Sequence, residues 1–324
     1  TAHEIAEIGY SQPEDVQRAV DEAETMVFNV AQGRVTDSMA FMHDLLGETL
    51  DDIEQLYDRG DAITGIPTGF IDLDELTAGL QPSNLIVVGA RPAMGKTSFA
   101  LNLVAHAAMN EQRPVLLFSL EMSKLELSKR MLCSEAKVDA TSIRNGRLKD
   151  DDWTKLAQAM GRLGKAQLWI DDDPNITVMD IRAKARRLKS KVGDMGLVVV
   201  DYLQLMSGRA KAENRQVEIS EISRGLKILA RELECPVIAL SQLSRGLEQR
   251  TDKRPMLADL RESGAIEQDA DIVMFLYRDE VYNLDSADKG QAEVIIAKHR
   301  AGPTGVVRLA WLGHQTRFAN MART

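Results

Sequence analysis

The chain has 324 residues, of which 44% are hydrophobic and 27% charged, and a formal net charge of −9 at pH 7. These values are ordinary for a globular protein with one large domain and a smaller appendage, and they exclude the bulk basicity of a general nucleic-acid-binding protein. Any nucleic-acid site must therefore be local, in loops or a channel. We find no stretch typical of a membrane span or a signal peptide and expect no membrane partner. Cys133 and Cys235 each lie in an apolar pattern, so we expect buried thiols in a reducing, cytoplasmic setting.

The first 58 or so residues are acidic and carry apolar residues at helical spacing. Ser11-Gln12-Pro13-Glu14 is typical of a helix start. A second apolar pattern, from Met39 to Leu56, predicts a long amphipathic helix, which could pack on its own domain or dock on a neighbouring subunit. Because the chain begins at Thr1 within a helical pattern, we expect that an amino-terminal part is missing. Turn-forming residues between Arg59 and Gly69 predict a linker.

From residue 84 onward, strand and helix patterns alternate, which predicts an α/β fold with a mainly parallel sheet covered by helices on both faces. The closely spaced strands at the end predict an antiparallel extension. The expected strands are 84–89, 114–119, 167–171, 196–201, 235–241, 271–277, 292–298 and 305–311. The expected helices are 97–110, 123–136, 150–163, 177–191 and 215–233.

The stretch from Leu85 to Ala100 combines a buried strand, a tight loop and a helix start. Its loop ends in Gly95-Lys96-Thr97, as a P-loop does, and the backbone N–H groups of such a loop hold polyphosphate. Lys96 would face the outer phosphates and the Thr97 hydroxyl would bind Mg²⁺. The generic spacing requires glycine at 90, where this chain has Ala90, which loses some left-handed freedom. The predicted nucleotide-binding residues are Ala90, Arg91, Pro92, Ala93, Met94, Gly95, Lys96, Thr97 and Ser98.

Three polar residues follow or end expected strands at the carboxyl edge, where open α/β sheets bind ligands. Asp201 ends an apolar strand and would act with Thr97 on Mg²⁺. Glu121 is a candidate to activate water, but a solvated glutamate near a helix start is an equally good interpretation of the residues alone. Gln242 could hydrogen-bond the γ-phosphate and report its loss.

Two basic segments follow. Residues 243–254 form a basic, glycine-containing loop directly after Gln242, and 261–264 form a second one. Such clusters are commonly solvated surface loops, but attachment to a γ-phosphate sensor favours a ligand-coupled element. Lys298 and Arg300 lie at a turn between two late strands, which is either a hairpin tip with exposed charges or the place of an arginine finger.

Together these motifs resemble the RecA-like core of DnaB-type replicative helicases. The resemblance covers residues 65 to about 320 and rests on segments in the same order, namely 90–97, 119–123, 200–204, 241–245, 259–264 and 298–303. DnaB-type loops also have alanine at the position of Ala90. The resemblance divides the chain into the end of a helical amino-terminal domain (1–36), a linker helix and linker (37–64) and a RecA-like ATPase domain (65–324).

This resemblance implies a homohexameric ring that hydrolyses ATP with Mg²⁺, moves 5′ to 3′ on single-stranded DNA and unwinds the duplex at the replication fork. A primase and a helicase loader are the implied partners. The implied active site takes Lys96, Thr97, Glu121, Asp201 and Gln242 from one subunit and Lys298 and Arg300 from the next. The implied DNA-binding residues are Arg245, Gly246, Arg250, Arg261, Glu262 and Gly264.

Other classes share parts of this pattern. The nearest alternative is another RecA-family ATPase, a recombinase or a clock-type ring, and a closed ring with helicase activity would separate the two. A P-loop small-molecule kinase would need an acceptor pocket and would act as a monomer. A non-catalytic ring scaffold would be expected to lack Lys96 or Glu121, and this chain has both.

Overall fold

The computed structural model describes residues 41–59, 63–206, 215–260 and 264–322, together with Ile5, Ile8 and Tyr10. The chain separates into two compact units, Thr1–Asp61 and Ala62–Thr324. In the first unit, helix α3 (Met42–Arg59) agrees with the predicted amphipathic helix. The earlier helical pattern, including the predicted start at residues 11–14, lies outside the described residues. Within the described ranges, no helix is both long and apolar enough to cross a membrane.

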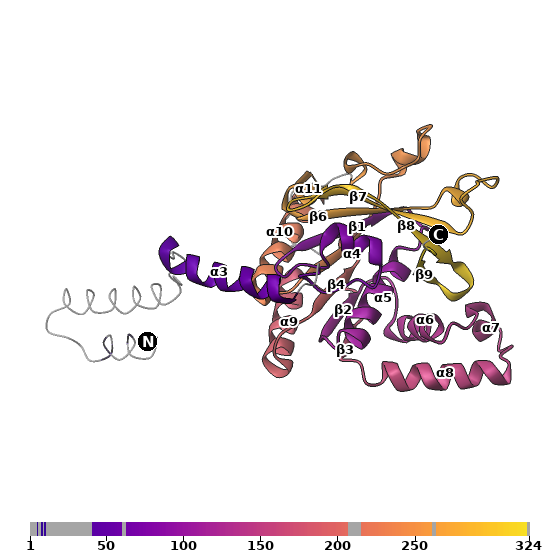
Figure 1. Cartoon of the computed structure of the whole chain (residues 1–324), viewed down its shortest axis with the longest axis horizontal. Coiled ribbons are helices and arrows are strands. Elements are labelled where there is room, and N and C mark those ends of the chain that lie inside the picture. The colour runs from indigo at the N-terminus through magenta and orange to yellow at the C-terminus, as the bar shows by residue number, and fades with distance from the viewer. Residues whose placement is uncertain are drawn as a thin grey trace. The chain divides into compact units, whose positions relative to one another are not determined.

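The second unit is built on a nine-stranded sheet of order β3-β2-β4-β5-β1-β6-β7-β8-β9 (Figure 1). Six strands pair in parallel: β1 (Leu85–Ala90), β2 (Val115–Ser119), β3 (Leu168–Asp171), β4 (Leu197–Asp201), β5 (Val237–Gln242) and β6 (Ile272–Tyr277). Three more extend the sheet in antiparallel fashion: β7 (Gln291–His299), β8 (Gly305–Leu312) and β9 (Arg317–Asn320). The predicted α/β fold with its antiparallel extension is thus confirmed, and β9 is the one strand of this sheet that was not predicted.

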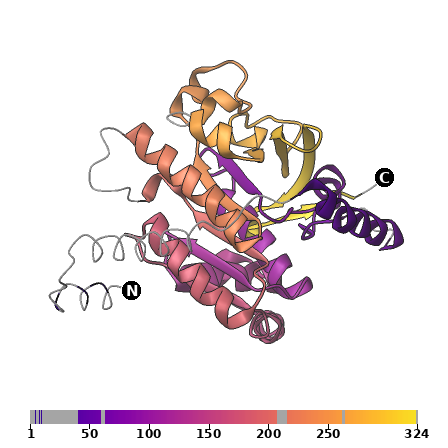
Figure 2. The same cartoon turned by 90° about the vertical axis from the view of Figure 1, so that its left-hand side faces the viewer.

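Helices cover both faces of this sheet, as its nearly continuous apolar strands require. On one face lie α5 (Lys96–Ala105), which continues as a π-helical turn over His106–Asn110, and α6 (Lys124–Ala136). On the other lie α9 (Val178–Val192) and α10 (Arg215–Leu233), onto which Figure 2 looks. Figure 1 shows α7 (Ala140–Arg144) and α8 (Asp150–Leu163) beside α6. The short helix α11 (Gly264–Asp269) precedes β6.

The segment that leads into β1 contains a short helix, α4 (Ile71–Thr77), which was not predicted. The buried Asp74 carboxylate accepts the Thr68 N–H at 2.8 Å and 3.1 Å through its two oxygens. Asn320, the last residue of β9, donates its side-chain amide to the Gly69 carbonyl and accepts the Ile71 N–H, both at 2.9 Å. The first segment of this unit is therefore held in place by its last strand.

The two cysteines are buried free thiols, as predicted. Cys133 lies on α6, and Cys235 lies just before β5. Burial raises the pKa of the Cys235 thiol to about 12, so this side chain is neutral at physiological pH. Both thiols act as apolar core groups.

Candidate nucleotide site

The register of the sheet explains why distant residues meet at one edge. Gln242 pairs with Ala90 across β5 and β1, and Asp201 pairs with Ser119 across β4 and β2. The carboxyl ends of parallel strands share one edge of a sheet, which is where ligands of such folds bind. The P-loop and Glu121 follow just after two of these strand ends. The register therefore brings Lys96, Thr97, Glu121, Asp201 and Gln242 to one edge of the sheet.

A cavity of about 330 Å³ opens at this edge. Among the predicted nucleotide-binding residues, Met94 alone does not line it, because its side chain is 2% exposed and packs into the core. The lining residues are Ala90, Arg91, Pro92, Ala93, Gly95, Lys96, Thr97, Ser98, Glu121, Arg130, Tyr202, Gln242, Trp311 and Thr316.

Four of these lining residues were not predicted from the sequence: Arg130, Tyr202, Trp311 and Thr316. Tyr202 could have been found, because it directly follows the carboxylate that ends β4. Arg130 lies on α6, and the other two lie on β8 and in the turn before β9. Only the three-dimensional packing of these elements brings them to the cavity.

Asp201 is buried behind the P-loop. Its Oδ2 accepts a hydrogen bond from the Thr97 hydroxyl at 2.7 Å. Its Oδ1 accepts no hydrogen bond from the described residues and lies 3.5 Å from Lys96 Nζ. A buried carboxylate oxygen without a hydrogen-bond donor is costly unless a cation faces it, and here the Lys96 ammonium does so.

The Lys96 ammonium is nearly buried between an aromatic ring and a carboxylate. Its side chain is 12% exposed, and its Nζ lies 4.2 Å from the centre of the Tyr202 ring. Burial lowers the pKa of Lys96, while the carboxylates of Asp201 and Glu121 oppose this shift. Asp201 Oδ1 lies 3.5 Å from this ammonium, and Glu121 lines the same cavity as Lys96.

The P-loop backbone uses left-handed conformations at Ala93 (φ +68°) and Gly95 (φ +94°). Ala90 is the last paired residue of β1, so position 90 needs no left-handed conformation and the expected cost of losing glycine there does not arise. Glycine is needed one place earlier, because a Cβ at Gly89 would lie 2.9 Å from the side chains of Leu243 and Phe275.

One further residue supports this loop and was not predicted. Arg278, just after β6, donates Nη1 to the Ala93 carbonyl at 2.9 Å. Its guanidinium also stacks on Trp311, with 4.6 Å between Cζ and the ring centre. The only sequence signal was its place directly after an expected strand, at the ligand-binding edge.

Thr97 and Asp201 provide two hard oxygen donors side by side. The described residues contain no group of three or more His, Cys, Asp or Glu side chains that could hold a metal ion. Mg²⁺ keeps several waters and shares substrate phosphates, so it needs only one or two protein oxygens. The buried Asp201 Oδ1 without a donor fits such an ion.

The predicted DNA-binding residues lie on the segment after β5 and around α11. Arg245 and Gly246 are exposed on a 3₁₀ turn, Arg245–Gln249. Arg250 is less available, since its Nη2 binds the buried Asp259 carboxylate at 2.8 Å and its side chain is 29% exposed. Gly264 is the first residue of α11. Arg261 and Glu262 lie outside the described residues.

Lys298 and Arg300 lie at the opposite edge of the sheet. His299 pairs with Ile272 at the start of β6, which in turn pairs near the start of β1. Since β1 has six residues and a strand rises ~3.3 Å per residue, this turn lies roughly 20 Å from the P-loop of its own chain.

Both side chains of this turn make contacts within the chain. The Lys298 ammonium donates to main-chain carbonyls at the end of α11 and just beyond it, among them Ala270 at 2.7 Å. Arg300 Nη1 lies 3.4 Å from the buried Asp271 carboxylate, but its own side chain is 61% exposed. Arg300 is thus the more available cation of the pair.

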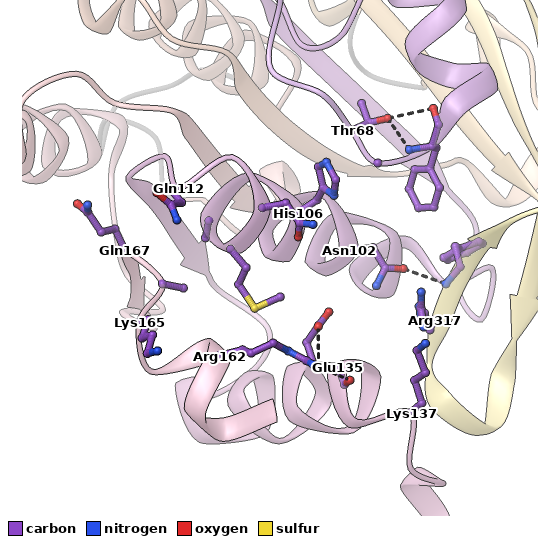
Figure 3. A pocket seen from close by; sticks show the side chains of 17 residues that line it. Thr68, Asn102, His106, Gln112, Glu135, Lys137, Arg162, Lys165, Gln167 and Arg317 are labelled. Carbon is purple, nitrogen blue, oxygen red and sulfur yellow. Dashed lines mark hydrogen bonds and ion pairs between the residues drawn. The ribbon is translucent and has the colours of Figure 1, made fainter. Parts of the chain in front are cut away.

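A larger cavity, of about 760 Å³, lies by the far end of α5 (Figure 3). Figure 3 shows Lys137, Arg162, Lys165 and Arg317 around it, and Arg162 pairs with Glu135 at 3.7 Å. None of the predicted site residues lines this cavity. The assembled P-loop edge, rather than this larger cavity, is therefore the candidate nucleotide site.

Comparisons with known proteins agree with this geometry. Residues 65–320 match the model of the DnaB-like helicase C terminal domain. The replicative DNA helicase DnaB of Geobacillus stearothermophilus is 54% identical, over 100% of this chain and 71% of the relative. The replicative DNA helicase DnaC of Bacillus subtilis is 52% identical, with the same coverage.

Two solved structures are also similar. A solved ATPase domain superposes with a TM-score of 0.84 at 43% identity, covering 88% of this chain and 100% of that one. A DnaB-like replicative helicase, solved in a study of its interactions with primase, gives a TM-score of 0.79 at 40% identity, covering 99% of this chain and 76% of that one. The matched motifs, the sheet topology and these similarities lead to one conclusion: the chain belongs to the DnaB-like helicase family.

Proposed function

We propose that this chain hydrolyses ATP with Mg²⁺ and that a homohexameric ring of it moves 5′ to 3′ on single-stranded DNA, unwinding the duplex at the replication fork. The observation that carries this proposal is the cavity lined by Lys96, Thr97, Glu121 and Gln242, with the buried Asp201 bound to Thr97 and paired with Lys96, in a member of a helicase family. The similarity of the whole chain to replicative DNA helicases supports the same activity.

Within one subunit, residues 90–98 cradle the phosphates, with Lys96 balancing the charge on the outer ones. Glu121 orients and activates the attacking water. Gln242 contacts the γ-phosphate and changes its contacts when that phosphate leaves. Thr97 and Asp201 would hold Mg²⁺, which supplies positive charge to the phosphates when it is bound.

Arg300, with Lys298 beside it, acts on the nucleotide of the adjacent subunit. A group roughly 20 Å from its own P-loop can reach a γ-phosphate only across an interface, which supports action in trans. There a guanidinium would stabilise the charge that develops during transfer. Lys298 supports the turn through its contacts at the end of α11.

The DNA-contacting surface consists of Arg245, Gly246, Arg250, Arg261, Glu262 and Gly264, on segments that line the ring channel. The cations bind phosphates rather than bases, because a motor must move over any sequence. The net charge of −9 supports a local rather than a general site.

We also propose the division into residues 1–36, 37–64 and 65–324, which the separation of compact units near residue 61 supports. Helix α3 exposes apolar side chains such as Leu46, Leu50 and Ile53, which suits contact with another protein surface. A primase and a helicase loader are the proposed partners, and the free thiols suit a cytoplasmic setting.

The decisive experiment measures ATP hydrolysis, with and without single-stranded DNA, together with the mass of the assembly. We expect a hexamer whose ATP hydrolysis is stimulated by DNA. We also expect it to unwind only forked duplexes that have a single-stranded 5′ tail. A Lys96→Ala variant controls for contaminating ATPases. Strand exchange by a filament, or phosphate transfer to a small molecule by a monomer, would replace the proposal with one of the alternative classes.

A further inference from the structure

Arg91 follows β1 within the P-loop and borders the nucleotide cavity, yet its guanidinium binds elsewhere. Its Nε and Nη2 donate to Glu248 Oε1 at 2.8 Å and 2.6 Å, and its Nη1 donates to the Leu243 carbonyl at 2.8 Å. The side chain is only 9% exposed. All of these partners lie on the segment that carries Arg245, so a P-loop residue holds the proposed DNA-contacting turn directly.

The base of the same turn is also held from its other side. Gln204 lies just beyond Asp201, and its side-chain amide binds both backbone groups of Gln242, accepting the N–H at 3.1 Å and donating to the carbonyl at 3.2 Å. The Leu243 N–H donates to the Ala90 carbonyl at 3.1 Å. The P-loop, through Arg91, and the segment after β4, through Gln204, therefore both bind residues 242–248. We expect a shift of either segment to move that turn.

Of these contacts, the Arg91–Glu248 pair is the one suited to transmit a shift into the turn itself. The planar guanidinium uses three N–H groups at once, so its position fixes the direction of its partners as well as their distance. Gln204 holds only the strand end, before the turn begins. Glu248 lies three residues after Arg245 on the same 3₁₀ turn, and Leu243 lies two residues before it. The contacts of Arg91 therefore flank the exposed Arg245 on both sides.

We propose that Arg91 is a positioning residue that couples the nucleotide state of the P-loop to the DNA affinity of the 243–249 turn through Glu248. This inference rests on the proposed role of that turn in binding DNA. When the P-loop backbone changes conformation on binding the phosphates, the Arg91 guanidinium shifts Glu248. This shift changes the orientation of the Arg245 side chain toward DNA.

The test measures the affinity for fluorescent single-stranded DNA in the presence of a non-hydrolysable ATP analogue and in the presence of ADP. The ratio of the two affinities reports the coupling. We expect Glu248→Ala to reduce this ratio by roughly fivefold or more, the lower range of allosteric coupling. Glu248→Gln should retain part of it, because its amide oxygen still accepts from Arg91. Fluorescent nucleotide binding should be unchanged in both variants.

Glu293→Ala is the matched control. Glu293 pairs with Arg254, farther along the same segment, at 2.9 Å and without contact to the P-loop. Its variant should keep the wild-type ratio within about twofold. An unchanged ratio in Glu248→Ala, or an equal fall in the Glu293 variant, overturns the coupling role. Equal DNA affinity of the wild-type protein with both nucleotides overturns it as well. If Arg245→Ala binds DNA as tightly as the wild type, the proposed DNA role of this turn fails instead.

Discussion

The two edges of the central sheet carry similar charged groups but differ in how these groups are satisfied. At the amino edge, the buried Asp271 carboxylate accepts the Leu85 N–H at 2.8 Å and pairs with Lys227. At the carboxyl edge, the buried Asp201 keeps one oxygen without a hydrogen-bond donor beside Lys96. Both Asp271 oxygens accept hydrogen bonds within the chain, the second from Arg300 Nη1 at 3.4 Å, whereas among the described residues Asp201 Oδ1 has only its ion pair with Lys96 at 3.5 Å.

This difference separates structural from functional charge. A buried carboxylate that is fully hydrogen-bonded fixes the fold, because removing a partner would leave an uncompensated charge. A buried carboxylate with an oxygen that accepts no hydrogen bond can bind a further ligand. Such carboxylates concentrate at functional sites. The comparison can be tested by removing single groups at each edge.

The largest effect is expected at the carboxyl edge. Lys96→Ala should abolish ATP hydrolysis and sharply weaken nucleotide binding, because the charge that faces the outer phosphates is lost. The measurements are steady-state ATPase rates and fluorescent nucleotide titration. Lys227→Ala, at the amino edge, should lower thermal stability yet leave nucleotide binding intact. Equal loss of nucleotide binding in both variants would contradict the distinction between a functional carboxyl edge and a structural amino edge.

Arg300→Ala is expected to slow hydrolysis by roughly 10³–10⁵-fold, as loss of an arginine finger does. Because Arg300 lies at the amino edge, its effect must come from the neighbouring subunit. Mixing inactive Lys96→Ala and Arg300→Ala subunits should therefore restore part of the activity, since some interfaces pair an intact Lys96 with an intact Arg300. With subunit exchange confirmed by mass, a mixture without activity would contradict the trans arrangement or the independent firing of sites.

Glu121→Gln should lower turnover by roughly 10²–10⁴-fold while ATP binding persists, because only activation of water is lost. Single-turnover hydrolysis and nucleotide titration distinguish this variant from Lys96→Ala. If both variants lose binding to the same extent, Glu121 is not the base.

The smallest effects concern the basic turn. Arg245→Ala should lower the slope of log affinity against log salt by roughly 0.7, the loss of one phosphate contact to a single strand. Arg250→Ala should lower this slope as well and in addition cost about 1 kcal/mol of stability, because it removes a partner of the buried Asp259. Binding titrations over a salt series and thermal melts check the two. An unchanged slope for Arg245→Ala would remove that residue from the channel.

Much of this site could be predicted because local sequence fixes where strands end. Apolar runs located β1, β4 and β5. The Gly95-Lys96-Thr97 motif after β1 predicted Lys96, and polar residues at the ends of β4 and β5 predicted Asp201 and Gln242. The partners of Arg91 could not be predicted, because Glu248 is 157 residues away and only packing joins them. The same holds for Trp311 and for helix α4, whose seven residues lack a side-chain cap and a clear helical period.

The contact between Asn320 and the segment at Gly69 joins residues 251 positions apart. Because synthesis proceeds from the amino terminus, the Gly69 carbonyl and the Ile71 N–H can form these hydrogen bonds only after β9 has been made. Loop closure over such a span is slow relative to local helix formation. The nucleotide-binding unit is therefore expected to complete its fold only once its final strand has left the ribosome, and truncation before Asn320 should leave α4 loosely held.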